Sequence, residues 1–116
     1  MYIFENMLNL TNFLKIISDK NRLIILYLLS RNILCVCDIQ KLIPLTQGAL
    51  SIQLKNLMSA GLLESFKQGK WVFYKLSKDI LEYQLNILGE LFKQLDKDEE
   101  VQQIISKLEI SEICKV

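Results

Sequence analysis

A single proline, Pro44, separates two short helical patterns and constrains the fold of this chain more than any other residue. Proline lacks a backbone N–H and disfavours helix in the residue before it, so the helix predicted over residues 36–43 must end there. Thr46 can cap a second helix over residues 47–60, and Gly61 suits the position just after its end. Two short helices joined by so tight a corner are typical of a helix-turn-helix.

Two short apolar runs follow, residues 62–66 and 71–76, around a four-residue turn at 67–70. The second run alternates between two faces, which is the period of a strand. A turn that contains glycine between two such runs predicts a β-hairpin. Because Lys67 and Lys70 lie at its tip, we expect a wing that touches phosphate or the minor groove. The alternative is that these lysines only keep a sheet edge soluble.

Longer helical patterns flank this unit, over residues 3–17, 20–30, 79–95 and 99–110. The predicted fold class is mainly α with a small β-hairpin, in the order α-α-α-α-β-β-α-α. We expect one winged helix-turn-helix domain over residues 1–116. Its predicted parts are dimerisation helices at 1–18 and 79–116, the helix-turn-helix at 36–60 and the β-wing at 62–76.

The apolar content of the chain predicts a dimer. Hydrophobic residues make up 51% of its 116 residues and the mean hydropathy is +0.24, more than a small monomer can bury. The longest apolar run, residues 23–29, is far shorter than the roughly 20 residues of a membrane span, and the N-terminus lacks the positive segment of a secretory signal. We therefore expect a two-fold homodimer, with no membrane contact.

Charge is segregated along the chain although the formal net charge is only +1. Residues 41–78 carry six lysines and one glutamate, whereas residues 79–116 carry nine acidic residues and four lysines. A basic centre followed by an acidic end indicates that one face meets an anion such as DNA. An ordinary solvated surface is the alternative.

Cys35 and Cys37 are the residues best suited to chemistry, because thiolates bind soft ions and the chain has no histidine. Residues two apart on a regular helix point about 200° apart, so both sulfurs can reach one ion only at a helix start. Cys114 is the third cysteine. An odd number of cysteines without a secretory signal predicts a reducing, cytoplasmic setting.

These features resemble the ArsR/SmtB family of dimeric bacterial winged-helix repressors, which leave operator DNA on binding metal or metalloid ions. The resemblance covers about residues 13–78 and lies in Leu14-Lys15, Arg22-Leu23, Leu34–Ile39, Leu50-Ser51, Ala60–Leu63 and Lys67–Ser77. The Cys-Val-Cys-Asp element resembles the branch that senses arsenite, antimonite, cadmium or lead.

The chain also departs from the family pattern. Arsenite repressors often carry a third cysteine where this chain has Gln40, and cadmium sensors use cysteines in the N-terminal region, where this chain has none. Without histidine, the family's zinc or nickel site on the last long helix is excluded. A common Ser-Arg-His-Leu segment is here Ser51-Ile52-Gln53-Leu54, which removes one DNA contact.

The residues and the resemblance together predict a homodimeric repressor without a permanent cofactor, released from an inverted-repeat operator by a soft ion. The expected ligands are Cys35 and Cys37, with Cys114 as a candidate third ligand. The two recognition helices are expected roughly 34 Å apart. The predicted DNA-contacting residues are Gln47, which is best placed to read a base, with Gly48, Ser51, Ile52, Gln53, Lys55, Lys67 and Lys70.

Two alternatives stay open. The same fold could respond to oxidants or persulfides through Cys114 and one of the other cysteines, because Cys35 and Cys37 are expected to form a poor disulfide. Ile52 and the low net charge would also suit a protein-interaction module that does not bind DNA. An enzyme is not expected, because the chain has no histidine, no glycine-rich phosphate loop and no evident carboxylate pair.

Overall fold

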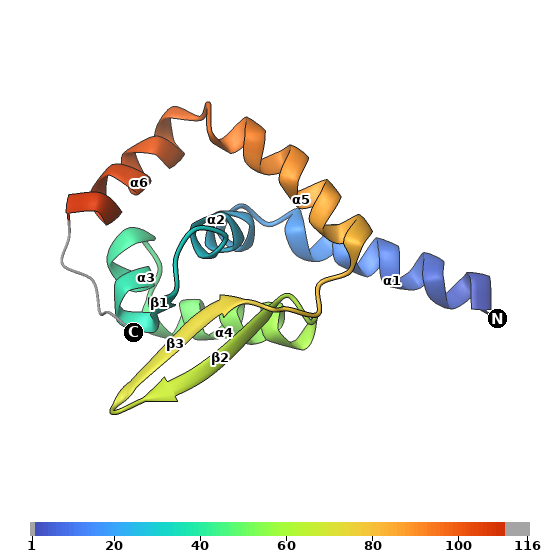
Figure 1. The fold of residues 1–116 in the computed structure, drawn as a ribbon, viewed down its shortest axis with the longest axis horizontal. Coiled ribbons are helices and arrows are strands. Elements are labelled where there is room, and N and C mark those ends of the chain that lie inside the picture. Colours follow the sequence, from blue (N-terminus) through green and yellow to red (C-terminus); the bar gives the residue numbers. More distant parts are fainter. Residues whose placement is uncertain (1, 111–116) are drawn as a thin grey trace.

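The computed structural model describes residues 2–110, and the side chains of residues 7–108 (Figure 1). Six helices and three short strands follow one another in the described chain. They are α1 (Tyr2–Ile17), α2 (Lys20–Leu29), β1 (Leu34–Cys35), α3 (Val36–Leu42), α4 (Gln47–Ser59), β2 (Leu63–Gln68), β3 (Trp71–Leu76), α5 (Glu82–Leu95) and α6 (Glu99–Ile110).

Helix α2 forms the centre of the core. Asp19 caps it by accepting a hydrogen bond from the backbone N–H of Arg22 at 3.0 Å. Six consecutive residues, 24–29, are buried, so this helix has no solvent-facing side over most of its length. The other helices and the sheet surround α2 in Figure 1.

The predicted helix-turn-helix is confirmed. Helix α3 ends just before Pro44, and the Thr46 hydroxyl caps α4 by accepting from the backbone N–H of Ala49 at 3.2 Å. Gly61 follows α4 with a φ of 78°, a conformation that side chains with a Cβ rarely adopt. The buried side of α4 is Leu50, Leu54 and Leu57. Met58, next to Leu57 in the chain, is 38% exposed.

The sheet contains one strand that the sequence did not predict. β2 and β3 form the expected antiparallel hairpin, turning at Gly69 with a φ of 63°. Strand β1 adds to the other edge of β3, giving the order β1-β3-β2. Its register places Leu34 opposite Tyr74 and Cys35 opposite Phe73. The sheet therefore joins the first cysteine directly to the wing.

Helices α5 and α6 lie outside the reading unit and close over α2. Helix α5 begins at Glu82, three residues later than predicted, because Gln84 accepts from the backbone N–H of Leu81 at 3.1 Å and fixes the helix start there. Helix α6 packs against α3. No helix among residues 2–110 has the length and apolar character that crossing a bilayer requires.

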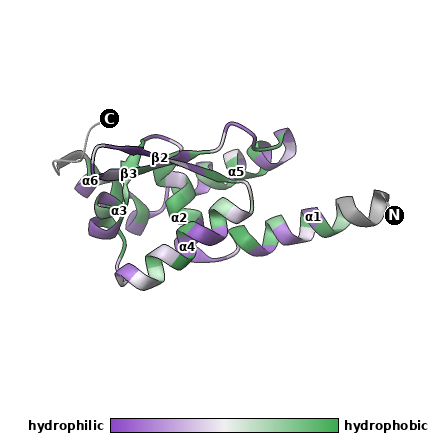
Figure 2. Cartoon of the chain, turned by 90° about the horizontal axis from the view of Figure 1, so that it is seen from below, coloured by the Kyte–Doolittle hydropathy of each residue, from purple (hydrophilic) through white to green (hydrophobic). Residues whose placement is uncertain are grey.

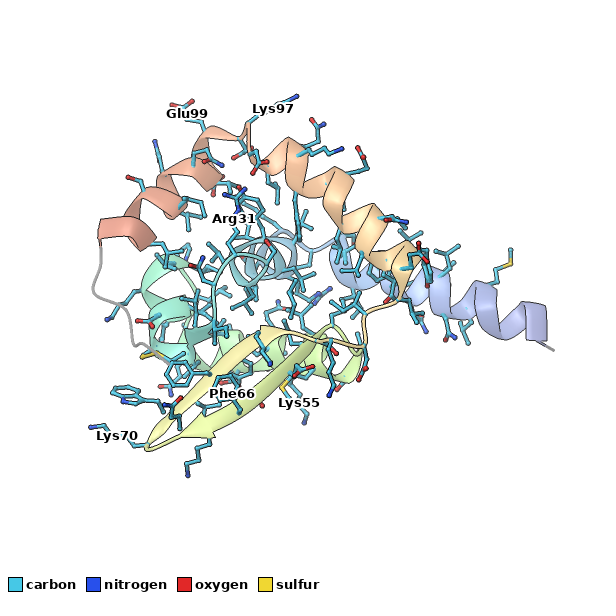
Figure 3. All side chains as sticks on the ribbon, in the orientation of Figure 1. Arg31, Lys55, Phe66, Lys70, Lys97 and Glu99 are labelled. Carbon is cyan, nitrogen blue, oxygen red and sulfur yellow. A yellow bond between two sulfur atoms is a disulfide. The ribbon has the colours of Figure 1, made fainter. Side chains whose placement is uncertain are left out.

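A hydrogen-bonded network fixes the turn between α5 and α6 to α2. The fully buried Tyr27 hydroxyl donates to Asp96 at 2.5 Å and accepts from Gln102 at 3.3 Å. Arg31 contacts the same Asp96 oxygen, and Figure 3 shows its side chain near the α5–α6 turn. Burial, and next the bond to Asp96, raise the pKa of Tyr27, so its phenol stays neutral.

Replacing Tyr27 with phenylalanine should lower the free energy of unfolding by about 1–2 kcal/mol, because the variant cannot make the buried hydrogen bond to the Asp96 carboxylate. Urea denaturation followed by circular dichroism measures this. The matched control is Lys20→Met, which removes a surface ion pair between α2 and Glu100 of α6. Both side chains of that pair are more than half exposed, so the control should cost less than about 0.5 kcal/mol. Equal effects would contradict the proposed importance of the buried network.

Helix α1 and the start of α5 leave a connected apolar surface exposed. Figures 1 and 2 show α1 extending away from the body, with hydrophobic residues along its length. Helix α1 lies beside the start of α5, where the rings of Phe13 and Tyr83 meet edge to face with 6.0 Å between their centres. The exposed apolar residues of this α1–α5 surface are Met7, Leu8, Leu10, Leu14, Leu81, Tyr83 and Leu85. A contiguous exposed apolar surface is typical of a protein–protein interface, and the dimerisation role of these helices stays a prediction.

Candidate metal centre and nucleic-acid interface

The two neighbouring cysteines lie where β1 turns into α3. Cys35 is the residue before the helix, with extended backbone angles of φ −80° and ψ 161°, and its side chain is fully buried. Cys37 lies in the first turn and is partly exposed. Because Cys35 is not yet helical, the usual divergence of positions i and i+2 does not apply, as expected for a site at a helix start.

The sulfurs of Cys35 and Cys37 are joined as a disulfide, with Cα atoms 5.4 Å apart. The expectation of a poor disulfide assumed helical geometry at both residues, whereas Cys35 is extended, which lets the two sulfurs meet. A disulfide offers no thiolate, so an ion can bind here only after two electrons and two protons convert the bond into two thiols.

Asp38 completes the cluster and was missed as a site residue. Its side chain is 1% exposed, and Oδ2 lies 3.1 Å from Sγ of Cys35. The possible ligand atoms of Cys35, Cys37 and Asp38 all lie within 4.8 Å of one another. The sequence signal was present, because a carboxylate directly follows the thiol pair in a short helix whose next residue, Ile39, is fully buried.

The Asp38 carboxylate lies near the start of a helix and near one ammonium group. It lies in the first turn of α3, where the helix dipole is positive. Lys41 Nζ is 3.9 Å from its Oδ1, but that ammonium is well exposed and its attraction is screened. A carboxylate, two sulfurs and a helix N-terminus thus share one small buried region beside the sheet.

Two structural connections lead from this cluster to the elements predicted to contact DNA. Helix α3 leads through the corner at Pro44 into α4 and buries Ile39 and Leu42 in the shared core. Strand β1 pairs through Cys35 with Phe73 of β3, a strand of the wing. Cys35 is therefore connected through the backbone and the sheet to both α4 and the wing.

The exposed face of α4 contains most of the predicted DNA-contacting residues. Gln47, Gly48, Ser51, Ile52 and Lys55 are all exposed, and Ile52 is 62% exposed. They span the first turns of the helix, which in a helix-turn-helix approach the base edges. Figure 3 shows Lys55 projecting from α4 toward solvent.

Gln53 lies on another side of α4. Its Oε1 accepts a hydrogen bond from Arg22 at 2.8 Å, and the same guanidinium donates to the carbonyl of Ile16 at 2.7 Å. The side chain is partly buried between α4 and α2. The sequence did not indicate this interaction, which leaves Gln53 outside the exposed face.

The wing carries both predicted lysines at its tip. Lys67 and Lys70 are exposed, and Lys70 Nζ lies 5.2 Å from the ring centre of Trp71 (Figure 3). Between the wing and α4 is an open hollow of about 390 Å³, lined by Ser51, Lys55, Met58, Ser59 and Tyr74. Hydroxyl and ammonium groups facing one hollow suit a DNA phosphate.

The third ligand predicted from the sequence is not among these groups. Cys114 lies outside the described residues. Gln40, at the position of the missing cysteine, lines a hollow between α3 and α6. Within the described side chains, Asp38 is the third group beside the two sulfurs.

Comparison with known proteins identifies related sequences. Residues 19–65 match the family model described as bacterial regulatory protein, arsR family. The chain is 40% identical to an arsenical resistance operon repressor of Escherichia coli over 95 residues, which is 81% of this chain and 80% of that protein. It is 39% identical to the cadmium resistance transcriptional regulatory protein CadC of Listeria innocua over 87 residues, covering 74% and 72%.

Solved structures support the fold. A homodimeric winged helix-turn-helix DNA-binding domain from Mycobacterium bovis superposes with a TM-score of 0.66. The match covers 82% of this chain and 85% of that domain, at 21% identity. The predicted winged helix-turn-helix architecture is thereby confirmed.

Proposed function

Because this chain belongs to the arsR family of bacterial regulatory proteins, we propose that it is a homodimeric, metal-responsive DNA-binding repressor. A soft metal or metalloid ion bound at Cys35 and Cys37 would release it from its operator. The observation that carries this proposal is the position of the thiol pair, at the junction of β1, which pairs with the wing, and α3, which leads to the recognition helix. The inducers to be tested are arsenite, antimonite, cadmium and lead.

The magnitudes are compatible with such a switch. Shifting a protein from about 99% to about 1% DNA-competent requires roughly 5.5 kcal/mol of differential binding. Cysteine-rich metal sites provide on the order of 10 kcal/mol. Only about half of the binding free energy must therefore be coupled to the DNA-facing elements.

The proposed DNA contacts divide by chemistry. Gln47 would read a base edge in the major groove, while Ser51 and Lys55 would contact phosphate beside the hollow between α4 and the wing. Lys67 and Lys70 would hold the backbone from the wing. In the dimer, two recognition helices roughly 34 Å apart would read an inverted repeat.

The Lys67→Ala/Lys70→Ala variant should bind operator at least tenfold more weakly at moderate salt, because alanine cannot bind phosphate. Each ammonium–phosphate interaction removed should reduce the slope of log affinity against log salt by about 0.9, so four lysines per dimer should reduce it by up to roughly 3.6. Fluorescence anisotropy of labelled operator at several salt concentrations measures both. The control is Lys93→Ala/Lys97→Ala near the end of α5, which should leave the slope unchanged. A wing variant with the wild-type slope would exclude these contacts.

We also propose that the protein acts in a reducing cytoplasm, where the thiols are available for an ion. Cys114 remains a candidate third ligand, supplied by the same subunit or by its partner, and its serine variant tests that role. The test of the function as a whole is a titration of the reduced dimer with each ion in the presence of operator. Release by no thiophilic ion would contradict the proposed function.

The disulfide favours a second candidate function, a repressor that responds to oxidation. In that case the Cys35–Cys37 disulfide itself would change operator affinity. Comparing the reduced protein with the protein oxidised by diamide, both without metal, separates the two functions. Equal operator affinity in both states supports the metal response alone, whereas a large difference supports the redox response.

A further inference from the structure

We propose that Gly48 and Ile52 of α4 form an apolar notch for the C5-methyl group of a thymine in the major groove. Each half of the operator then carries a thymine at the base pair that faces this Gly48–Ile52 notch. This inference rests on the proposed function and specifies one base of the DNA that the protein reads. It assigns a contact to Ile52, which the sequence left without one.

The position of Ile52 makes its exposure informative. Single exposed isoleucines are common on protein surfaces, but this one is 62% exposed in the second turn of the proposed recognition helix. Its side chain cannot bind phosphate, and branching at Cβ leaves it essentially one rotamer in a helix. Ile52 therefore presents a rigid apolar group on the face of α4 that is proposed to meet DNA.

Gly48 lies one turn before Ile52 and leaves room for a base. Glycine weakens a helix, and Gly48 does not have the positive φ that requires glycine at Gly61 and Gly69. Packing does not require it either. Among the described residues, nothing beyond the neighbouring residues and the helix backbone lies within 4 Å of the place where a Cβ would be. Helix side chains lean toward the N-terminus, so Ile52 flanks this open space.

Interactions on the other sides of α4 fix the direction in which the Gly48–Ile52 notch faces. Three leucines of α4 are buried in the core, and Gln53 accepts a hydrogen bond from Arg22 of α2 at 2.8 Å. Lys55, on the exposed face, projects toward solvent in Figure 3. A helix held in this way resists rotation about its axis, so the notch meets DNA in one orientation.

The chemistry of the notch selects thymine. In the major groove the C5-methyl of thymine is an apolar group, whereas the other base edges present donors and acceptors that isoleucine cannot satisfy. A protein partner does not fit, because a stable interface buries roughly 800 Å² on each side. The other exposed side chains on this face, Gln47, Ser51 and Lys55, are polar and suit DNA.

Substitution of thymine by deoxyuridine tests the contact, because it removes only the methyl group. The probe is an operator duplex selected from a random pool with the reduced wild-type protein, with the thymines replaced one position at a time in both half-sites. At one position uracil should weaken wild-type binding about 15-fold, since burying one methyl group contributes about a factor of four per half-site. Fluorescence anisotropy measures the affinities.

Two variants complete the test. Ile52→Ala should bind the thymine operator more weakly and bind the thymine and uracil operators within about threefold of each other. Its matched control is Ile33→Ala, because Ile33 is 40% exposed but lies outside α4, and this variant should keep the full uracil effect. Gly48→Ala should melt at or above the wild-type temperature, since alanine favours helix and has open space. It should nevertheless bind operator at least about fivefold more weakly, because its methyl group occupies the space of the thymine.

Three results would overturn the role of the notch. They are the absence of a uracil effect at every thymine of the bound operator, an equal uracil effect in Ile52→Ala and wild type, and wild-type operator affinity of Gly48→Ala. Unchanged operator affinity of Ile52→Ala would also overturn it, and would leave Ile52 free for a protein partner. In each case the wild type still binds operator, so the proposed function stands. Failure of the wild-type protein to select any duplex would refute the proposed function, and the notch with it.

Discussion

The Cys35→Ser/Cys37→Ser variant should bind operator with an affinity within about threefold of the wild type. The factor by which cadmium weakens operator binding should be at least 100-fold smaller in this variant than in the wild type. Serine is nearly the size of cysteine, so the fold is retained, whereas its hydroxyl stays protonated and is a poor ligand for a soft ion. A full switch requires the ion to bind the DNA-free state about 10⁴-fold more tightly than the DNA-competent state. A 100-fold change in the ratio of operator affinities without and with cadmium is therefore readily detected. Anisotropy of labelled operator, titrated with protein at fixed cadmium concentration, measures the ratio.

The operator for this experiment can be selected from a random duplex pool with the reduced protein. Cys114→Ser is a companion variant that removes a thiol outside the described residues, and a retained response to cadmium would show that Cys35 and Cys37 bind the ion without it. Undiminished release of the double serine variant would show that the inducer binds elsewhere in the molecule. Loss of operator binding without any inducer would show instead that the thiols are needed for the fold.

Placing a charge on the α1–α5 surface should produce a monomer with operator affinity reduced by at least 100-fold. Leu14 of α1 and Leu85 of α5 are 44% and 48% exposed, so Leu14→Asp/Leu85→Asp changes little within one subunit. In a dimer the same carboxylates would be buried against the partner at a cost of several kcal/mol. A monomer also loses the effective concentration, on the order of millimolar, that brings the second recognition helix to its half-site. Sedimentation velocity measures the mass, and anisotropy measures the affinity.

The control for the dimer surface is Ile33→Asp. Ile33 is 40% exposed, similar to Leu14, but it lies in the connection between α2 and β1 rather than on α1 or α5. This variant should remain dimeric and bind operator normally. A dimeric Leu14→Asp/Leu85→Asp protein would place the interface on another surface.

Local signals explain why much of the fold could be predicted from the sequence. Asp19, Pro44 and Thr46 fix helix ends through their own backbone or side-chain chemistry, and each acts within a few residues. Gly61 and Gly69 likewise mark positions that need a positive φ. For this reason α2, α3, α4 and the hairpin were predicted within one or two residues of their bounds.

Interactions between distant residues could not be predicted in the same way. Strand β1 is only two residues long and exists because β3, some 40 residues later, pairs with it. The extended backbone of Cys35, and with it the disulfide and the hydrogen bond to Asp38, follows from that pairing. Gln53 is oriented by Arg22 from another helix, and no local pattern indicates this. The roles of the DNA-facing residues and of Cys114 remain predictions.

We propose that an ion bound at the β1–α3 junction weakens the binding of the recognition helix and the wing to DNA. The most direct measurement is the operator affinity of the reduced wild-type dimer, with and without one equivalent of cadmium per subunit. We predict that the dissociation constant rises at least 100-fold when cadmium is bound. An unchanged dissociation constant, with cadmium shown to occupy Cys35 and Cys37, would contradict this mechanism of release.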